Sequence, residues 1–272
     1  MELKPILEVG DLHFSYKKTP VLEGIDFALY KGEVVSLLGP NGCGKSTLMR
    51  LMLKLLDSKR AIKLHGAFLE SYSHKDVASH IAYIPQYHNV PFNYSVLEMV
   101  LMGRISKLGF FGMPTQNDRD KAHEALEKAG ISHLAGRPFG QLSGGQKQLV
   151  LLARALAQEV NLFFMDEPVN GLDYGNQIRL LELIDSLAKE GYTFLKTTHY
   201  PDHALLISSR VAVMNGGKII ANGAPDEVIR SSMIEEVYGI KADIITHGAH
   251  ARCVPVFGNK HLNEHVRLSG RD

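Results

Sequence analysis

Residues 39–47 carry the complete pattern of a phosphate-binding loop, GxxxxGK[ST]. An apolar run at 34–38 precedes the loop and a helix-like run at 48–56 follows it, which is the strand–loop–helix context that gives this pattern a mechanism. Glycines let backbone N–H groups curl around a polyphosphate, and the following helix N-terminus favours negative charge. We therefore predict that the loop binds a nucleotide. Its residues are Gly39, Pro40, Asn41, Gly42, Cys43, Gly44, Lys45, Ser46 and Thr47.

Two side chains of the loop and two carboxylates form a candidate catalytic set. Lys45 would reach the β- and γ-phosphates, and the hydroxyl of Ser46 would ligand Mg²⁺. Asp166 and Glu167 end the apolar run 162–165, where successive side chains diverge. Asp166 would hold Mg²⁺ and Glu167 would polarise the attacking water. The alternative, an exposed acidic turn, is disfavoured by the phosphate loop in the same chain.

A glycine-rich segment, Leu142-Ser143-Gly144-Gly145-Gln146, precedes an apolar helical stretch that continues through Ala157. Taken alone, it is the start of a helix with Ser143 as its N-terminal cap. Such a helix start also favours anions, because its first N–H groups are unpaired. The segment therefore has both a structural and an anion-binding interpretation.

These residues need a sheet and helices to bring them together. Apolar strands that alternate with helices predict a parallel sheet covered on both faces, hence an α/β fold. A polar turn separates the first two expected strands, and the pair Gly216-Gly217 predicts a hairpin. We expect strands at 6–13, 21–29, 62–69, 81–84, 161–165, 192–198 and 210–214. We expect helices at 118–129 with Asp118 as the cap, at 144–157 and at 175–190.

The composition of the chain limits which cellular compartment and which kinds of partner we expect. The net charge of +1 in 272 residues gives no attraction to nucleic acid, so no nucleic-acid partner is expected. Cys43 and Cys253 lie far apart and predict reduced thiols in the cytosol. The chain begins without a signal-like segment and contains no uncharged apolar run of about 18 residues, which predicts that it does not span a membrane.

Taken together, the three motifs resemble those of the ATP-binding-cassette (ABC) ATPases. Residues 39–47 resemble the Walker A motif of that family, 142–146 its signature and 162–167 its Walker B motif, and the resemblance covers about residues 6–240. It implies ATP hydrolysis on a P-loop NTPase (RecA-like) core with an N-terminal antiparallel β subdomain. It also implies an inserted α-helical subdomain at about 87–158, and leaves 241–272 as a short C-terminal extension.

The resemblance assigns roles to four further residues. Tyr16 matches the aromatic residue that stacks on adenine, and Gln86 matches the glutamine that touches Mg²⁺ and the attacking water. Asp173 falls in the segment called the D-loop, and His199 matches the switch histidine that contacts the γ-phosphate. The D-loop departs from the family pattern at Asn170-Gly171. The expected catalytic residues are thus Glu167, His199, Gln86 and Lys45.

The family resemblance also implies a second copy of the chain as partner. Two copies would pair head-to-tail, so that Ser143, Gly144, Gly145 and Gln146 of one close over the γ-phosphate held by Lys45 of the other. ATP and Mg²⁺ would be the cofactors.

Two residues near the end of the strand at 192–198 are unusual. His199 lacks the acid that usually follows the switch histidine in this family. Lys196 lies in an apolar strand, where we expect it to have a carboxylate partner or to lie at the strand end.

Residues 95–104, 175–182 and 237–240 resemble ATPases of importers for iron chelates, haem, cobalamin and related metal cargo, including molybdate or tungstate. The resemblance implies a separate permease dimer, docked beside the Gln86 loop, a substrate-binding protein outside, and a place on the cytoplasmic face of the plasma membrane. The main alternative is a soluble ABC ATPase acting on a protein assembly such as an iron–sulfur cluster scaffold. A small-molecule kinase is a third, weaker alternative.

The tail of the chain contains scattered histidines at 247, 250, 261 and 265. Their irregular spacing favours a solvated tail over a metal site.

Overall fold

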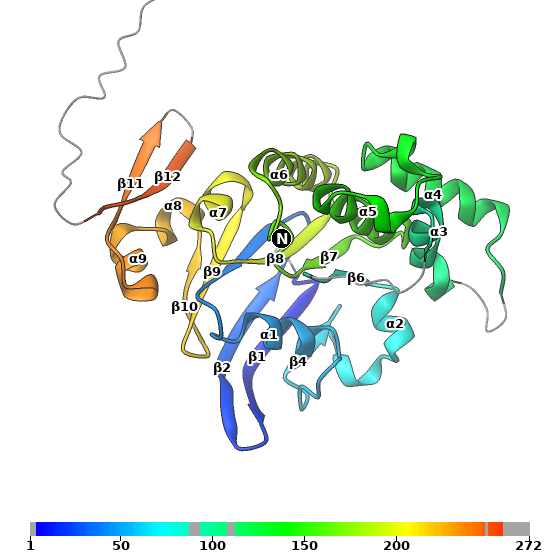
Figure 1. The fold of residues 1–272 in the computed structure, drawn as a ribbon. Helices are drawn as coiled ribbons and strands as arrows, with labels where there is room; N and C mark the ends of the chain where they lie inside the picture. Colours follow the sequence, from blue (N-terminus) through cyan, green and yellow to red (C-terminus); the bar gives the residue numbers. More distant parts are fainter. Residues whose placement is uncertain (1–3, 87–92, 108–111, 248–249, 258–272) are drawn as a thin grey trace, which may run out of the picture.

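A six-stranded sheet forms the centre of the chain in the computed structural model, which describes residues 4–86, 93–107, 112–247 and 250–257 (Figure 1). All its strands are parallel except the edge strand β10. Strands β3, β7 and β8 are buried along their whole length, which explains the apolar runs of β3 and β7. Strand β8 is equally buried although its sequence includes three threonines and a lysine. The spatial order is β10 (Lys218–Gly223), β9 (Arg210–Asn215), β3 (Val34–Leu38), β8 (Thr193–Thr198), β7 (Leu162–Met165) and β6 (Ile81–Ile84).

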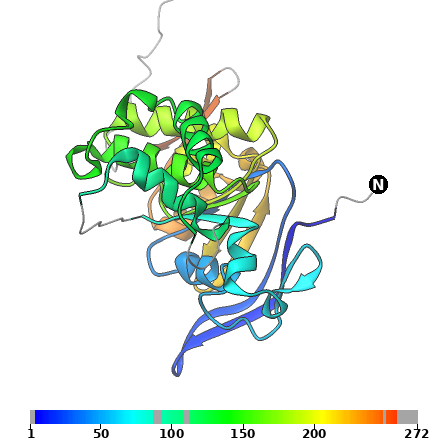
Figure 2. The ribbon, with the colours of Figure 1, turned by 90° about the vertical axis from the view of Figure 1, so that its right-hand side faces the viewer.

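An antiparallel sheet covers one side of this core. Its strands lie in the order β2-β1-β4-β5, and a single hydrophobic cluster joins it to helix α1 and to the central strands. Figure 2 shows the long β1–β2 ribbon at the opposite end of the molecule from the main helices. The elements are β1 (Leu7–Tyr16), β2 (Thr19–Leu29), β4 (Ile62–Leu64), β5 (Ala67–Phe68) and α1 (Lys45–Met52).

Helices cover the other face of the central sheet. Helices α3, α4 and α5 pack against one another, and with α6 they bury the second large hydrophobic cluster. Capping boxes fix the N-termini of α2, α3, α4 and α5, which explains where these helices begin. The bounds are α2 (His74–Ala78), α3 (Val96–Leu101), α4 (Gln116–Lys128), α5 (Gly144–Ala157), α6 (Tyr174–Lys189), α7 (Pro201–Ile207), α8 (Pro225–Val228) and α9 (Ser231–Tyr238). This architecture confirms the predicted α/β fold with its antiparallel sheet and helical segment.

The predicted N-cap of α4 was wrong. Thr115 is the cap and Asp118 is the third residue of the helix, where its carboxylate accepts from the backbone N–H of Thr115 at 2.9 Å. Asp118 also accepts from the buried guanidinium of Arg104 at 3.0 Å. The hydrogen bonds from Thr115, followed by the bond from Arg104, lower the pKa of Asp118 to about 2. Thr and Asp both occur at helix starts, so the sequence alone placed the boundary three residues late.

The importer-like segment at 95–104 has a packing role. Gly103 lies so close to α5 that a Cβ there would stand 2.1 Å from the carbonyl oxygen of Arg154. Arg104 is 3% exposed and donates to Asp118, to Glu159 and to the carbonyl of Ala157. The glycine and the arginine therefore fix α3 against α5. Residues 87–92, which follow Gln86 in the loop predicted to lie beside the permease, and residues 108–111 lie outside the described residues.

A hairpin of β11 (Ala242–His247) and β12 (His250–Pro255) follows α9. The backbone N–H of Cys253 donates to Asp202 on α7 at 2.7 Å, so the hairpin is attached to the core. The predicted choice between a solvated tail and a metal site falls outside the described part of the chain, because that part leaves out His261, His265 and the side chains of His247 and His250. The domain limits at 87, 158 and 240 stay predictions.

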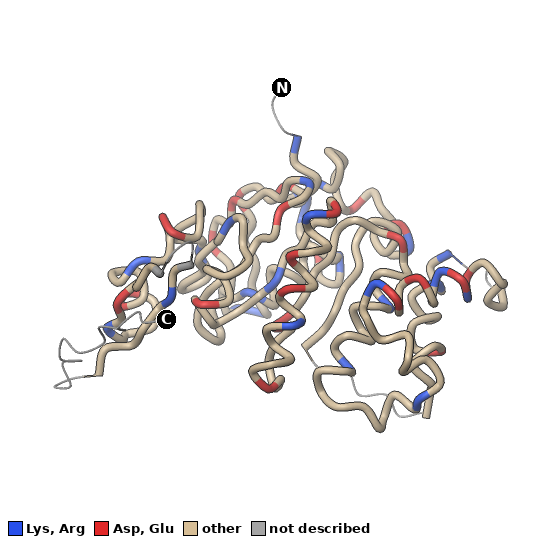
Figure 3. The backbone as a smooth tube through the Cα atoms, turned by 90° about the horizontal axis from the view of Figure 1, so that it is seen from above, with Lys and Arg blue, Asp and Glu red and all other residues tan. Residues whose placement is uncertain are grey.

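Charges of both signs are interspersed over the elements, as a net charge of +1 suggests (Figure 3). No helix in the described part of the chain has the length and apolar character needed to cross a bilayer.

Candidate active site

The phosphate loop connects the buried strand β3 to helix α1, as its sequence predicts. Gly44 caps α1 with φ 107°, and a Cβ at Gly39 would stand 2.2 Å from the carbonyl oxygen of Met214. Side chains are therefore excluded at both positions. No side chain caps α1, which leaves its first N–H groups directed at the loop. Lys45 is buried, and its ammonium donates to the carbonyl oxygens of Gly39 and Pro40 at 2.7 and 2.8 Å.

The loop surrounds a hollow of about 160 Å³. Because Glu167 lines the same hollow, the fold brings the loop and the second carboxylate together from positions that are distant in the sequence. An anion in the hollow would meet one ammonium and the unpaired start of a helix, which is the arrangement that stabilises a polyphosphate. The lining residues are Val21, Asn41, Gly42, Gly44, Lys45, Ser46, Thr47 and Glu167.

Thr197 contacts both of the neighbouring acidic residues at the end of β7, the carboxylate of one and the backbone of the other. Its hydroxyl donates to Asp166 Oδ1 at 2.6 Å and accepts the backbone N–H of Glu167 at 2.8 Å. Ser46 Oγ donates to the same oxygen of Asp166 at 3.3 Å. Glu167 itself has φ 46°, a left-handed backbone that a non-glycine residue rarely adopts, so the hydrogen bond that its N–H donates to Thr197 holds a strained residue in place.

The carboxylate of Glu167 has three side-chain partners. Gln86 Nε2 and Asn170 Nδ2 both donate to Oε2, at 3.1 and 3.0 Å, and His199 Nδ1 lies 3.3 Å from Oε1. The three come from the end of β6, the loop before α6 and the end of β8. Parallel strands end at one edge of the sheet, which is why residues so distant in sequence meet here. The arrangement can orient a base or an acid beside a phosphate.

The glycine-rich segment 142–146 starts α5 as expected, with a reciprocal capping box between Ser143 and Gln146. Gly145 packs against α6, where an added Cβ would stand 2.5 Å from the side chain of Asn176. Asp173 caps α6 and accepts from the backbone and the amide of Asn176. A second group of predicted site residues therefore lies together where α5 meets α6, namely Gly144, Gly145 and Asp173. None of these three lines the hollow beside Lys45.

Tyr16 does not line the hollow either. It ends β1 with a side chain 42% exposed and meets the ring of Phe14 edge-on at 4.9 Å. An exposed aromatic face at a strand end is available to a planar base. Its role in stacking on adenine stays a prediction.

The sequence did not single out Thr197 and Asn170 as partners of the carboxylates. A hydroxyl residue in a buried strand, two positions before His199, is the signal that could have identified Thr197. Asn170 departs from the D-loop pattern, but its contact with Glu167 depends on the turn after β7, where the N–H of Asn170 donates to the carbonyl of Glu167.

Lys196 contradicts the prediction of a carboxylate partner or a strand-end position. It is the fourth of six residues in β8, only 1% exposed, and its ammonium donates only a long 3.4 Å bond to the carbonyl of His203 among the described residues. Burial lowers the pKa of Lys196 to about 7. Burial of His203, followed by the charge of Lys196, lowers the pKa of His203 to about 4. The strand accommodates a lysine because that lysine loses its proton easily.

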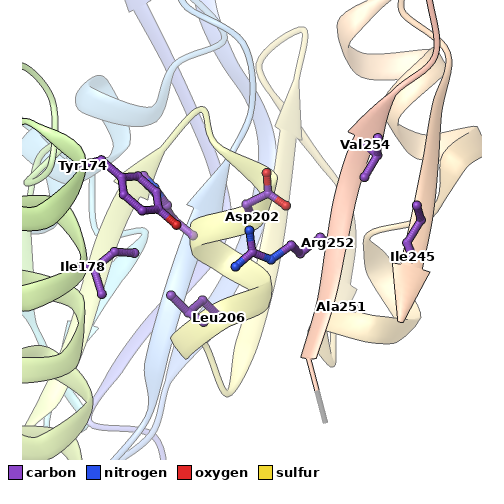
Figure 4. Close-up of a pocket in the computed structure, with 9 residues that line it drawn as sticks. Tyr174, Ile178, Asp202, Leu206, Ile245, Ala251, Arg252 and Val254 are labelled. Carbon is purple, nitrogen blue, oxygen red and sulfur yellow. The ribbon is translucent and has the colours of Figure 1, made fainter. Parts of the chain in front are cut away.

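A separate groove of about 600 Å³ lies between α6, α7 and the C-terminal hairpin. Figure 4 shows Tyr174 and Ile178 on one side of it, Arg252 and Val254 on the other, and Leu206 between them. No residue of the phosphate loop lines this groove, so it is distinct from the hollow beside Lys45.

The family model described as ABC transporter matches residues 22–170. The chain is 36% identical to the iron(3+)-hydroxamate import ATP-binding protein FhuC of Bacillus subtilis, over 88% of this chain and 90% of that protein. It is 35% identical to the hemin import ATP-binding protein HmuV of Streptomyces coelicolor, over 88% and 85%. A solved structure described as a metal-chelate type ABC transporter in an inward-facing conformation aligns with TM-score 0.82 and 32% identity, over 93% of this chain and 98% of that one.

Proposed function

The chain belongs to the ABC transporter family and is an ATPase, and from this premise we propose that it powers an importer of a metal chelate. The relatives named above are the ATP-binding proteins of iron-hydroxamate and hemin import, and the structural neighbour is of the metal-chelate type. These names favour the importer over a soluble ATPase that serves an iron–sulfur scaffold. An iron–siderophore or haem is the class of cargo that they suggest.

The contact of Glu167 with Gln86, Asn170 and His199, beside the hollow that Lys45 lines, is the observation that carries the catalytic part of the proposal. Lys45 and the start of α1 bind the phosphates. Glu167 takes a proton from water, the water oxygen bonds to the γ-phosphorus, and the bond to the bridging oxygen of ADP breaks. His199 holds the reacting phosphate.

Mg²⁺ fits the donors that the chain offers. Ser46 Oγ and Asp166 Oδ1 stand 3.3 Å apart, and the amide of Gln86 lies at the same edge. Hydroxyl, carboxylate and amide oxygens are the ligands that Mg²⁺ prefers. Ser46, Asp166 and Gln86 would hold the ion, which would neutralise charge on the β- and γ-phosphates when bound.

A second copy of the chain completes the site in this proposal. The signature residues start α5 and lie against α6, and none of them lines the hollow beside Lys45. A head-to-tail partner would place Ser143 and its neighbouring N–H groups over the γ-phosphate. Each ATP would then join two copies, so binding closes the pair and hydrolysis releases it.

Replacement of Glu167 by Gln tests the catalytic part. We expect Glu167→Gln to bind ATP normally and to lower turnover at least about a hundredfold, because the amide cannot accept the proton. Glu124→Gln, on the exposed side of α4, is the matched control and should leave turnover unchanged. Unchanged turnover in Glu167→Gln would exclude Glu167 as the base.

Association with a membrane permease tests the transport part. The proposal places the chain at the cytoplasmic face of the plasma membrane, bound to two permease subunits that receive cargo from a binding protein. Detergent extracts of the native host should yield this chain together with an integral membrane protein. Recovery with a soluble scaffold protein instead would support the alternative.

A further inference from the structure

Asn170 stands at the point where the D-loop departs from its usual composition, and it touches the candidate base. Its Nδ2 donates to Glu167 Oε2 at 3.0 Å, the same oxygen that Gln86 Nε2 reaches at 3.1 Å. Both donors lie within ordinary hydrogen-bond distance. Oε2 therefore receives two amide N–H groups, while Oε1 remains on the side of His199.

The backbone around this contact is fixed independently. Thr197 is fully buried and accepts the N–H of Glu167, whose φ is 46°. The N–H of Asn170 donates to the carbonyl of Glu167 at 3.0 Å, which closes a tight turn between the two residues. Because this turn joins Asn170 directly to Glu167, the amide contact does not depend on the position of the loop that begins at Gln86.

We propose that Asn170 is a positioning residue for ATP hydrolysis: its amide holds Oε2 of Glu167, so that Oε1 is the oxygen presented to the attacking water. The inference deepens the proposed function and rests on Glu167 acting as the base. A carboxylate held in one rotamer accepts a proton along one direction, and misplacing a catalytic group by about 1 Å can cost on the order of a hundredfold in rate.

The donor role and a packing role make different predictions. Asn170→Asp keeps the size and shape of the side chain but replaces the N–H donor by an oxygen that repels the carboxylate of Glu167. Asn170→Ala removes both the donor and the volume. If the amide donates to Glu167, both variants lose turnover. Because the charge of the aspartate would disturb Glu167 under either role, Asn170→Leu, which has a similar volume and neither a donor nor a charge, separates them: a donor role predicts that it loses turnover, and a purely space-filling role predicts that it keeps turnover.

The experiment measures steady-state ATP hydrolysis by the purified full-length chain. We expect kcat to fall about tenfold in Asn170→Ala and further in Asn170→Asp, with KM for ATP unchanged, because the contact acts on the chemical step. Both variants should still form the ATP-bound dimer, which shows that they fold. Asn222→Ala is the control, since Asn222 also has one side-chain hydrogen bond, to Arg210, but lies on β10.

A kcat in Asn170→Asp equal to that of the unmodified chain would overturn the inference, as would a raised KM with unchanged kcat. Glu167→Gln separates this failure from failure of the proposed function. If Glu167→Gln loses turnover while both Asn170 variants keep it, only the positioning role is wrong. If Glu167→Gln retains turnover, the base itself is wrong.

Discussion

The buried ammonium of Lys196 should lower the stability of the protein in a pH-dependent way. Lys196 is 1% exposed inside β8 and donates one long bond to the carbonyl of His203. Met has a similar length and no charge, so Lys196→Met removes the buried cation and keeps most of the packing. We expect this variant to be more stable than the unmodified chain.

The magnitude follows from the pKa of Lys196, which burial lowers from 10.5 to about 7. Between these pH values the unfolded chain binds one proton that the folded chain lacks, so the unmodified protein gains stability as pH rises. At about 1.4 kcal/mol per pH unit, the cost of the lysine is about 4 kcal/mol at pH 7 and about 2 kcal/mol at pH 9. The advantage of Lys196→Met should therefore shrink by about 2 kcal/mol over this range.

Urea unfolding at pH 7 and pH 9 measures both free energies. Lys218→Met, at an exposed lysine of β10, is the control and should change stability by less than about 0.5 kcal/mol at either pH. A gain in Lys196→Met that is equal at both pH values would refute the reasoning, because packing alone would then explain it. A loss of stability at pH 7 would show that the ammonium has a partner in solution.

Two shorter predictions concern packing and capping. Gly103→Ala should lower the free energy of unfolding by about 2 kcal/mol, because its Cβ would stand 2.1 Å from the carbonyl oxygen of Arg154. Gly136→Ala is the control, since no atom lies within 4 Å of the Cβ added there. Equal losses of stability in the two variants would contradict the close approach at Gly103. Ser143→Ala should cost about 1 kcal/mol through loss of the cap and should also lower ATP turnover. If Ser143→Ala lowers stability but leaves ATP turnover unchanged, Ser143 acts only as a helix cap and has no role in hydrolysis.

The sequence predicted the order of strands and helices because the relevant signals are local. The signals of the apolar runs in β3 and β7 and of the Ser143 cap of α5 each lie within a few neighbouring residues. The hollow beside Lys45 was also predictable, since its loop is contiguous and Glu167 follows a recognisable strand.

Contacts between distant segments were not predictable in the same way. The donation from Asn170 depends on the left-handed backbone of Glu167, and the bond from Thr197 depends on the register of β7 against β8. That Lys196 has no carboxylate partner in the part of the chain that the structure describes is likewise a tertiary property. Gly103 belongs to a segment that resembles importer ATPases, but its close approach to α5 depends on how the helices pack and is not visible in the sequence.

The mass of Glu167→Gln in solution tests the central claim most directly, namely that each ATP is shared by two copies of this chain. Light scattering on the purified variant should give 30.1 kDa without nucleotide. With ATP and Mg²⁺ it should give about twice that mass, and with ADP the monomer should return. A variant that stays monomeric with saturating ATP bound would contradict the shared site.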